Sequence, residues 1–462
     1  MDTSAKNQIS GSTVQLKLDS QEQEPLIPEN GHSAFNDPAF INNRNSPVHR
    51  WTPWIAGYSS DFVRHALNKY LIEPGVVLDP FAGVGTTLVD SFLLGHNSYG
   101  FEINPYAAFV SRVKAGAYKV STDSLNSEMQ SLRIFLNTAM QPGYKVKSKP
   151  PKGFKTRFEF YSPKILKKVL IIHDFINQIQ NENVRDIFRL AFASTMVKYS
   201  NYSYEPSLGA RVSSGKKNFD DFPVDQAIMT KLTEIVEDIA WLQKNMPSMD
   251  VPQISIINDS FFNYSKHLAP ESINLILTSP PYLNNYHYIR NTRPQMYWLD
   301  FVKEPKDTKP LENFNFGNYW QTVREKENIS LNFSLPDSNL ADQLELLRNK
   351  NQEKGIYGGN GWANYAASYF NDCYRFSIGI KYLLKKDGVA LVVLGNSILQ
   401  GIMIPTDRYF GEIAESVGLE LVQIDVPRRT RVGNSIIQSN VRVGKTESRN
   451  QLYESVVELK KL

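Results

Sequence analysis

Residues 75–87 read Gly-Val-Val-Leu-Asp-Pro-Phe-Ala-Gly-Val-Gly-Thr-Thr and decide the fold class. The apolar run at 76–78 predicts a short buried strand that ends at Asp79. A glycine-rich turn follows, and residues 86–94 then carry apolar side chains at helical spacing. Residues 98–103 return as a second strand. Strand, glycine turn, helix and strand make up one β-α-β unit of a parallel sheet.

The same alternation resumes further along the chain, which favours an α/β fold. Strand-like runs recur at 254–257, 273–277 and 389–394, so the sheet is expected to be mostly parallel. Two further strands, 419–426 and 453–459, are predicted to form an antiparallel hairpin at the end of the chain. A helix is expected to begin near Tyr369 and to lead into the strand at 389–394.

A tail and two insertions are expected around this sheet. Residues 1–48 are polar and show no period, which is typical of a disordered tail. Long amphipathic patterns in residues 121–250 predict a mostly helical insertion, and the polar, turn-rich residues 302–366 predict a second, irregular one. The sheet-forming domain is thereby assigned to residues 49–120, 251–301 and 367–462.

Composition indicates an ordinary globular protein. The chain has 462 residues, of which 41% are hydrophobic and 21% charged. No apolar run approaches the ~20 residues of a membrane helix, and the first residues lack the apolar core of a signal peptide. The one cysteine, Cys373, excludes an internal disulfide and a multi-cysteine zinc site, and no metal is expected. Together these features predict a cytoplasmic location.

The distribution of positive charge says more than the formal net charge of +4. One short stretch carries the following basic residues: Lys145, Lys147, Lys149, Lys152, Lys155 and Arg157. A second cluster consists of Arg428, Arg429 and Arg431. Either cluster could neutralise phosphates, and either is also compatible with a solvated loop.

The glycine turn has the features of a nucleoside site. Gly83 and Gly85 allow close backbone approach to a ligand at the carboxyl end of a strand, where open α/β sheets bind ligands. No lysine follows, so this is not a P-loop. Glu102 ends the second strand, 17 residues after Gly85, where a carboxylate can accept both hydroxyls of a ribose. S-adenosylmethionine, a nucleoside without pyrophosphate, fits this pattern. Taken alone, the turn is also compatible with a plain connection and Glu102 with a surface carboxylate.

A second chemical signal follows the strand at 273–277. Thr278-Ser279-Pro280-Pro281-Tyr282 should lie at the same edge of the sheet as the glycine turn. Two consecutive prolines stiffen the backbone, so the Ser279 hydroxyl and the Pro280 carbonyl can accept hydrogen bonds from an exocyclic amino group. Tyr282 offers a ring on which a base can stack. A Pro-Pro turn with a packing tyrosine is the alternative.

These motifs resemble the family of DNA amino-methyltransferases, which modify cytosine N4 or adenine N6. The resemblance covers roughly half of the chain and implies a Rossmann-like, S-adenosylmethionine-dependent fold acting on double-stranded DNA. It implies a cofactor site of Asp79, Pro80, Phe81, Gly83, Gly85, Thr86, Glu102, Asn104, Asp259 and Trp54. It implies that Ser279, Pro280, Pro281 and Tyr282 form the catalytic tetrapeptide.

The target base remains open between two candidates. In this family a serine at the start of the tetrapeptide favours cytosine N4, whereas aspartate or asparagine favours adenine N6. Methylation at cytosine carbon-5 needs a thiolate nucleophile, and the helical context of Cys373 favours a core residue instead. An RNA or protein-glutamine methyltransferase and a catalytically silent nucleic-acid-binding module are the remaining alternatives.

DNA contacts are expected in the insertions and near the catalytic turn. The second insertion, residues 302–366, is a candidate target-recognition region. The candidate DNA-binding residues are Arg211, Lys216, Lys217, Asn284, Tyr286, Arg290, Arg428, Arg429 and Arg431. The resemblance also implies a role in restriction-modification or phage defence. A companion restriction endonuclease would be a separate protein, so this sequence carries no signal for it.

Overall fold

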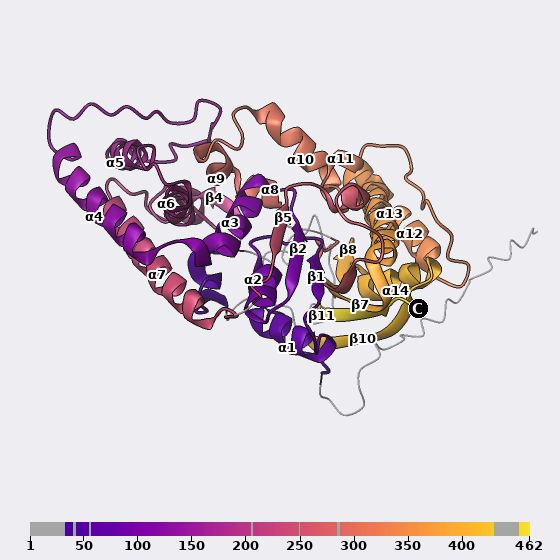
Figure 1. Cartoon of the computed structure of the whole chain (residues 1–462). Helices are drawn as coiled ribbons and strands as arrows, with labels where there is room; N and C mark the ends of the chain where they lie inside the picture. Colours follow the sequence, from indigo (N-terminus) through magenta and orange to yellow (C-terminus); the bar gives the residue numbers. More distant parts are fainter. Residues whose placement is uncertain are drawn as a thin grey trace, which may run out of the picture.

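The computed structural model describes residues 33–39, 43–54, 57–204, 207–248, 250–283, 287–428 and 452–462. A seven-stranded sheet of order β10-β11-β7-β6-β1-β2-β5 forms its centre (Figure 1). Its strands are β1 (Val76–Asp79), β2 (Asn97–Phe101), β5 (Ile254–Ile257), β6 (Ile273–Thr278), β7 (Leu384–Gly395), β10 (Glu420–Arg428) and β11 (Glu454–Lys460).

The pairing of these strands confirms the expected fold class. Strands β5, β2, β1, β6 and β7 run parallel, whereas β11 lies antiparallel between β7 and β10. The predicted C-terminal hairpin is therefore present. Because the first five strands run in the same direction, the residues that follow β1, β2, β5 and β6 meet at one edge of the sheet.

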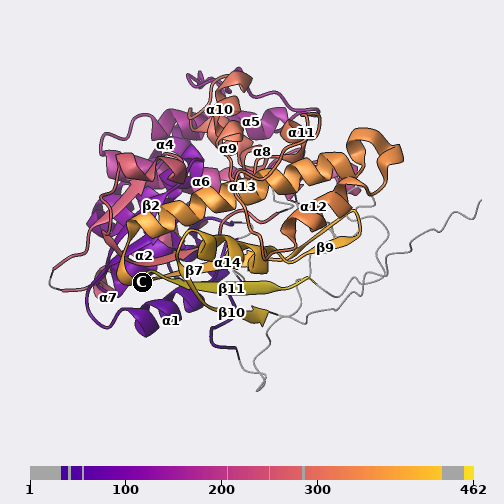
Figure 2. The same cartoon turned by 90° about the vertical axis from the view of Figure 1, so that its right-hand side faces the viewer.

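Side-chain alternation along the strands produces two apolar faces. On one face Val77 and Leu277 pack against α1 (Ser60–Tyr70). On the other face Leu78 and Ile276 pack against α13 (Gly359–Leu383) and α14 (Thr406–Ser416). Figure 2 shows α13 crossing the sheet as a long helix. The short hairpin of β8 (Ser397–Leu399) and β9 (Ile402–Ile404) follows β7.

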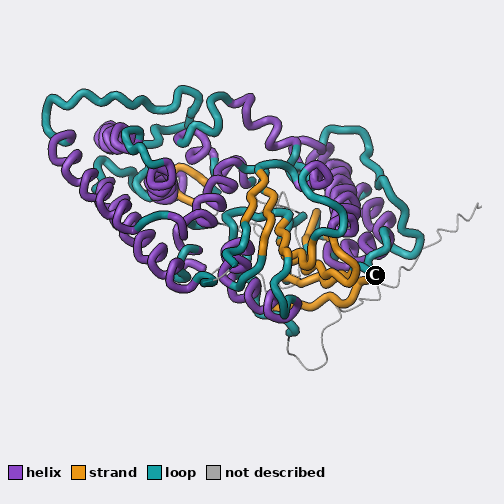
Figure 3. The backbone as a smooth tube through the Cα atoms, viewed as in Figure 1, coloured by secondary structure: helices purple, strands orange, loops and turns teal. Residues whose placement is uncertain are grey.

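Residues 121–250 carry four long helices, which Figure 3 shows beside the sheet. They are α4 (Thr122–Ala139), α5 (Pro163–Ile176), α6 (Glu182–Thr195) and α7 (Val224–Asn245), together with the hairpin of β3 (Tyr202–Tyr204) and β4 (Leu208–Ala210) and the short helix η4 (Arg211–Ser214). Ser162 caps α5 by accepting a hydrogen bond from the Ile165 amide at 3.3 Å, as its position before Pro163 predicts.

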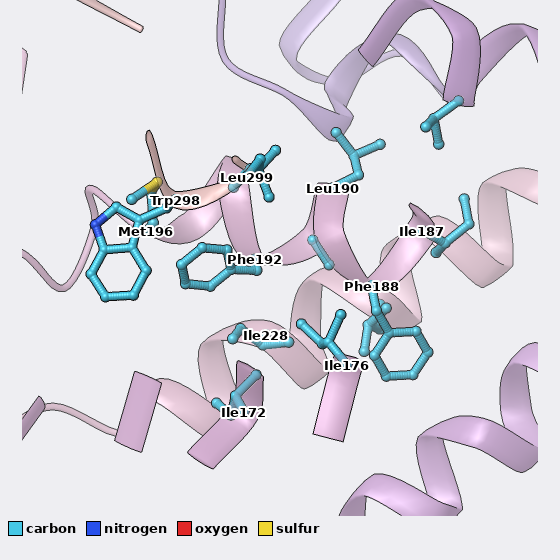
Figure 4. Packing of buried hydrophobic residues seen from close by; sticks show 14 of the residues in the cluster. Ile172, Ile176, Ile187, Phe188, Leu190, Phe192, Met196, Ile228, Trp298 and Leu299 are labelled. Atoms are coloured by element: carbon cyan, nitrogen blue, oxygen red, sulfur yellow. The ribbon is translucent and has the colours of Figure 1, made fainter. Parts of the chain in front are cut away.

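The core of these helices continues into the sheet domain. Buried side chains from α5, α6 and α7 pack with Trp298 and Leu299 at the end of α9 (Arg293–Trp298) (Figure 4). The same cluster includes residues of α2 (Thr86–Leu93) and α3 (Pro105–Gly116), which flank β2. The helical insertion therefore shares one apolar core with the β-α-β unit.

The second insertion contains the short helices η6 (Pro305–Thr308), α10 (Lys309–Asn313), α11 (Trp320–Val323), α12 (Leu340–Arg348) and η7 (Gln352–Tyr357). Other short helices lie outside it, namely α8 (Tyr288–Asn291), η2 (His49–Trp51), η3 (Ala117–Lys119) and η5 (Phe261–Lys266). The expected end of the insertion at residue 366 is wrong, because α13 already begins at Gly359. A Cβ at Gly359 would lie 1.8 Å from the Leu347 carbonyl oxygen, so this glycine permits close packing of the helix start.

Described structure also begins earlier than the expected boundary at residue 48. Phe35 is 4% exposed and its ring lies 6.0 Å from that of Phe62. The Phe35 amide and the Ser33 hydroxyl both donate to Asp425 in β10. The expected boundary at residue 48 is therefore too late, because residues 33–39 and 43–48 already pack on the sheet domain through a few apolar and hydrogen-bonded residues within a polar segment. No helix of the described ranges is long and apolar enough to cross a bilayer.

Asp238 in α7 anchors the segment that precedes α1. Its carboxylate accepts the Val48 amide and the Trp51 indole N–H, each at 2.8 Å, and pairs with the Arg50 guanidinium at 2.6 Å. Asp238 is 1% exposed and Trp51 is fully buried. The helical insertion thus fixes residues 48–51 through one buried carboxylate.

We predict that Asp238→Ala lowers the free energy of unfolding by about 3 kcal/mol, because two buried donors and a cation lose their common acceptor. Chemical denaturation measures the change. Glu237→Ala is the matched control, since Glu237 is an exposed carboxylate 3.8 Å from Arg50. Equal stability of the two variants would contradict the anchoring role of Asp238.

Candidate cofactor and target-base site

A cavity opens at the carboxyl ends of β1, β2, β5 and β6. It contains about 730 Å³ of empty space, part of it open to solvent. The expected site residues that line it are Trp54, Pro80, Phe81, Gly83, Glu102, Asn104, Asp259, Ser279 and Pro281. The structure therefore brings the glycine turn, the acidic strand end and the Ser-Pro-Pro turn to one cavity.

Glu102 lies on the cavity wall with its carboxylate held by two backbone donors. The Gly83 amide donates to Oε2 at 2.9 Å, and the Asn104 amide donates to Oε1 at 2.7 Å. Burial raises the pKa of Glu102 to about 7, although both backbone hydrogen bonds act in the opposite direction. A carboxylate fixed in this way can accept the hydroxyls of a ribose through its remaining lone pairs.

Trp54 and Gly83 form a close contact at the mouth of the cavity. A Cβ at Gly83, whose φ is +51°, would lie 3.2 Å from the Trp54 indole nitrogen. The Trp54 ring stacks on Tyr288 with an interplanar angle of 22°. The glycine therefore allows the indole to cover the turn, and the Tyr288 ring supports it from the start of α8.

Aromatic side chains form the apolar wall of the cavity. The rings of Phe262 and Phe316 are near parallel, at an interplanar angle of 17°, and the Phe81 ring meets Phe316 edge to face. A purine packs well against such a wall. Asp259 lies beside it and accepts hydrogen bonds from Asn263 and His267, each at 2.8 Å. Burial works against ionisation of Asp259, but its hydrogen bonds hold its pKa below the ordinary value.

Three residues expected at the cofactor do not line the cavity. Asp79 is fully buried, and its carboxylate accepts hydrogen bonds from Thr87 at 2.6 Å, from Thr278 at 2.7 Å and from Tyr58 at 3.0 Å. Gly85 is the N-cap of α2 and has a φ of +84°; a Cβ there would lie 2.4 Å from the Ser111 hydroxyl. Thr86 is buried in the first turn of α2. All three shape the turn rather than face a ligand.

Asn104 lines the cavity, but its side chain is engaged elsewhere. Its Oδ1 caps α3 by accepting the Tyr106 amide at 3.1 Å, and its Nδ2 donates to the Thr292 hydroxyl at 2.8 Å. Its backbone amide holds Glu102, as described above. The contribution of Asn104 to the site is therefore the position of Glu102 and of the neighbouring helix.

The Ser-Pro-Pro-Tyr turn reaches the cavity with two of its four residues. Ser279 and Pro281 line it, whereas Pro280 is buried behind them. Tyr282 is half-buried outside the lining, and its hydroxyl donates to Glu454 at 3.4 Å. Glu454 also pairs with Arg428 at 3.3 Å. Glu454, the first residue of β11, is thus in contact with the Ser-Pro-Pro-Tyr turn.

The candidate DNA-binding residues fall into three groups. Arg211 stacks 4.3 Å from the Phe219 ring, and the neighbouring Lys216 and Lys217 are exposed. Arg290 is exposed in α8, next to the cavity residue Ile289. Arg428 is bound to Glu454, as described above. Asn284, Tyr286, Arg429 and Arg431 lie outside the described residues.

The sequence did not point to several lining residues. These are Ser260, Phe261, Phe262, Tyr288, Ile289, Phe314, Asn315 and Phe316. Those at 260–262 directly follow Asp259, so their position after a strand was an available signal. Phe314, Asn315 and Phe316 belong to the second insertion, which was expected to read DNA, and only the folded structure brings them to the cavity.

The chain is similar to known DNA methyltransferases. A family model described as DNA methylase (N6_N4_Mtase) matches residues 32–111. The type II methyltransferase M.BsoBI of Geobacillus stearothermophilus is 22% identical over 85% of this chain and 82% of its own. The type II methyltransferase M.AvaI of Anabaena variabilis is 24% identical over 88% of this chain and 86% of its own. An rRNA methyltransferase structure from Streptomyces viridochromogenes covers 88% of this chain and 87% of its own at 8% identity, but its TM-score of 0.28 supports no argument.

Sheet order and cavity define a Rossmann-like methyltransferase for which S-adenosylmethionine is the methyl donor. The chain resembles the DNA amino-methyltransferase family, because the family model matches residues 32–111 and the two type II methyltransferases are 22% and 24% identical over most of the chain. The residues present fit this donor, since a buried carboxylate, a glycine under an indole and an aromatic wall share one cavity.

We predict that affinity for S-adenosylmethionine falls about tenfold per pH unit below pH 7, because a ribose is bound by the ionised form of Glu102 and its pKa is about 7. Calorimetric titration between about pH 5.5 and pH 7 measures the trend and avoids the amino group of the ligand, which titrates near pH 8. Glu102→Gln should bind more weakly at pH 7 and lose the trend. The same pH dependence in both proteins would contradict the role of Glu102.

Proposed function

We propose that the protein transfers a methyl group from S-adenosylmethionine to the N4 amino group of cytosine in double-stranded DNA. The observation that supports this most is that Ser279 and Glu102 line the same cavity. A methyl donor bound on Glu102 and a base held by Ser279 would therefore meet without a large movement of the chain. Reaction by direct transfer requires such positioning more than it requires acid-base chemistry.

The residues of the catalytic turn would hold the amino group of a base that has left the duplex. When bound, S-adenosylmethionine supplies an electrophilic methyl group. The Ser279 hydroxyl oxygen and the Pro280 carbonyl oxygen accept hydrogen bonds from the amino group, one from each of its two hydrogens. These bonds keep the nitrogen lone pair directed at the cofactor side of the cavity. The Tyr282 ring stacks on the base, and the hydrogen bond to Glu454 limits its rotation.

The choice of cytosine N4 rests on the serine at position 279. A hydroxyl is a neutral acceptor, whereas the aspartate or asparagine typical of adenine enzymes offers a carboxylate or amide oxygen. Chemistry at carbon-5 is disfavoured, because Cys373 is buried in α13 and burial raises the pKa of its thiol well above the ordinary value. Adenine N6 is the alternative target.

The relatives named as type II methyltransferases support a biological role in restriction-modification. In such a system a companion restriction endonuclease would be a separate protein that recognises the same site. We assign catalysis to the sheet domain, which comprises residues 49–120, 251–301 and the chain from the start of α13 at Gly359 to residue 462. The helical insertion at 121–250 would then support the cofactor site, because Asp238 binds Val48 and Trp51 in the segment that leads to Trp54.

Mass spectrometry of nucleosides tests the proposed base directly. Unmethylated duplex DNA incubated with the protein and S-adenosylmethionine should yield N4-methylcytosine. N6-methyladenine would retain the family chemistry and overturn the choice of base. The appearance of methyl label only in RNA or protein would contradict the DNA substrate.

We predict that Ser279→Ala lowers turnover roughly 100-fold while affinity for S-adenosylmethionine stays unchanged, because the lost acceptor acts on the base. Ser131→Ala, an exposed serine on α4, is the control. Tyr282→Phe should keep most activity, since it retains the stacking ring, and Tyr282→Ala should not. Full activity of Ser279→Ala would show that the hydroxyl has no part in holding the amino group.

A further inference from the structure

The extended segment between α4 and α5 carries a row of exposed cations that the proposed function does not use. We call residues 144–157 the lysine row, after its exposed members Lys145, Lys147, Lys149, Lys152, Lys155 and Arg157. Figure 3 shows the segment as a long loop along the upper edge of the molecule. Although this loop contains neither helix nor strand, hydrogen bonds hold its first half in place.

A single carboxylate fixes the start of the lysine row. Asp174 in α5 accepts the Tyr144 hydroxyl at 3.0 Å, the Lys147 amide at 2.9 Å and the Ser148 amide at 2.6 Å. Tyr144 and Val146 pack against the core of the helical insertion. Side chains therefore alternate between the core and solvent, which places Lys145, Lys147 and Lys149 outward at a spacing of roughly 7 Å.

The cations of the lysine row have no acidic partners among the described residues. The nearby carboxylates of Asp220 and Asp221 are already paired with Lys164 and Lys168, each at 2.6 Å. Six exposed cations within one short loop repel one another, and this repulsion costs free energy in the unbound protein. A polyanion laid along the row would remove that cost.

The later part of the row packs against α9, the helix that follows the cavity residues Tyr288 and Ile289. Phe154 packs on Tyr297 in α9 with ring centroids 5.6 Å apart, and the Arg293 guanidinium lies 5.9 Å from the Phe154 ring. Helix α9 directly follows α8, where Tyr288 and Ile289 line the cavity. Figure 2 shows α5, α8 and α9 in the same upper part of the molecule.

We propose that the lysine row is a docking surface for the phosphate backbone of the DNA duplex that flanks the target base. This inference rests on the proposed function. The outward spacing of Lys145, Lys147 and Lys149 is close to the distance between successive phosphates of one strand. Contacts of this kind set the position and register of the duplex and carry no sequence information. The row thus directs the DNA towards the cavity, and base recognition belongs to other residues.

The test is the salt dependence of DNA binding by the triple variant Lys145→Gln, Lys147→Gln, Lys149→Gln. Fluorescence anisotropy with a labelled duplex gives the slope of log affinity against log salt concentration. Loss of three phosphate contacts should reduce the magnitude of that slope by about 2.7 and lower affinity at least tenfold at 0.1 M salt. Lys→Arg at the same three positions should restore both.

A matched control removes three exposed lysines that are neither in the lysine row nor in the cavity lining. They are Lys119 in η3, Lys244 at the end of α7 and Lys386 near the start of β7, and their replacement by glutamine changes the net charge equally. Equal slopes for the two triple variants would overturn the proposal, as would loss of RNA binding with duplex binding intact. Unchanged affinity for S-adenosylmethionine verifies the fold, and the methylated nucleoside made by the wild-type protein tests the proposed function separately.

Discussion

The buried carboxylate of Asp79 is the constraint on which the site depends. It ends β1 and accepts hydrogen bonds from Thr87 in α2, Thr278 at the end of β6 and Tyr58 ahead of α1. It therefore ties the glycine turn to the strand that carries Ser279. Burial raises the pKa of Asp79, against the effect of these hydrogen bonds. Since Thr278 lies 199 residues from Asp79 in the sequence, this carboxylate aligns the glycine turn with the Ser-Pro-Pro-Tyr turn across the sheet.

Both insertions supply or hold residues of the cavity, so the sheet domain alone does not form it. The helical insertion holds residues 48–51 through Asp238, and Trp54 follows a few residues later over Gly83. The second insertion supplies Phe316, whose ring meets Phe81 and Phe262. A single apolar core joins the helical insertion to α2 and α3. Folding of the insertions and formation of the cofactor site are therefore coupled.

Local sequence patterns predicted the parts of the site that lie at strand ends. The spacing from Gly85 to Glu102 and the turn after β6 follow from the geometry of a parallel sheet, so their convergence was predictable. The direction in which each side chain points was not predictable from these patterns. Asp79 was expected at the cofactor, but its carboxylate turns inward because three buried hydroxyl donors surround it. Phe314, Asn315 and Phe316 could not be found, because long-range packing alone brings them to the cavity.

The central claim is that the donor and the target base share one cavity, with the ribose on Glu102. A crystal structure with S-adenosylhomocysteine bound tests it most directly. The account predicts ribose hydroxyls within hydrogen-bonding distance of Glu102, the adenine against the wall of Phe262 and Phe316, and the sulfur facing Ser279. A ligand in another cavity, or one whose sulfur faces away from the Ser-Pro-Pro turn, would contradict the account.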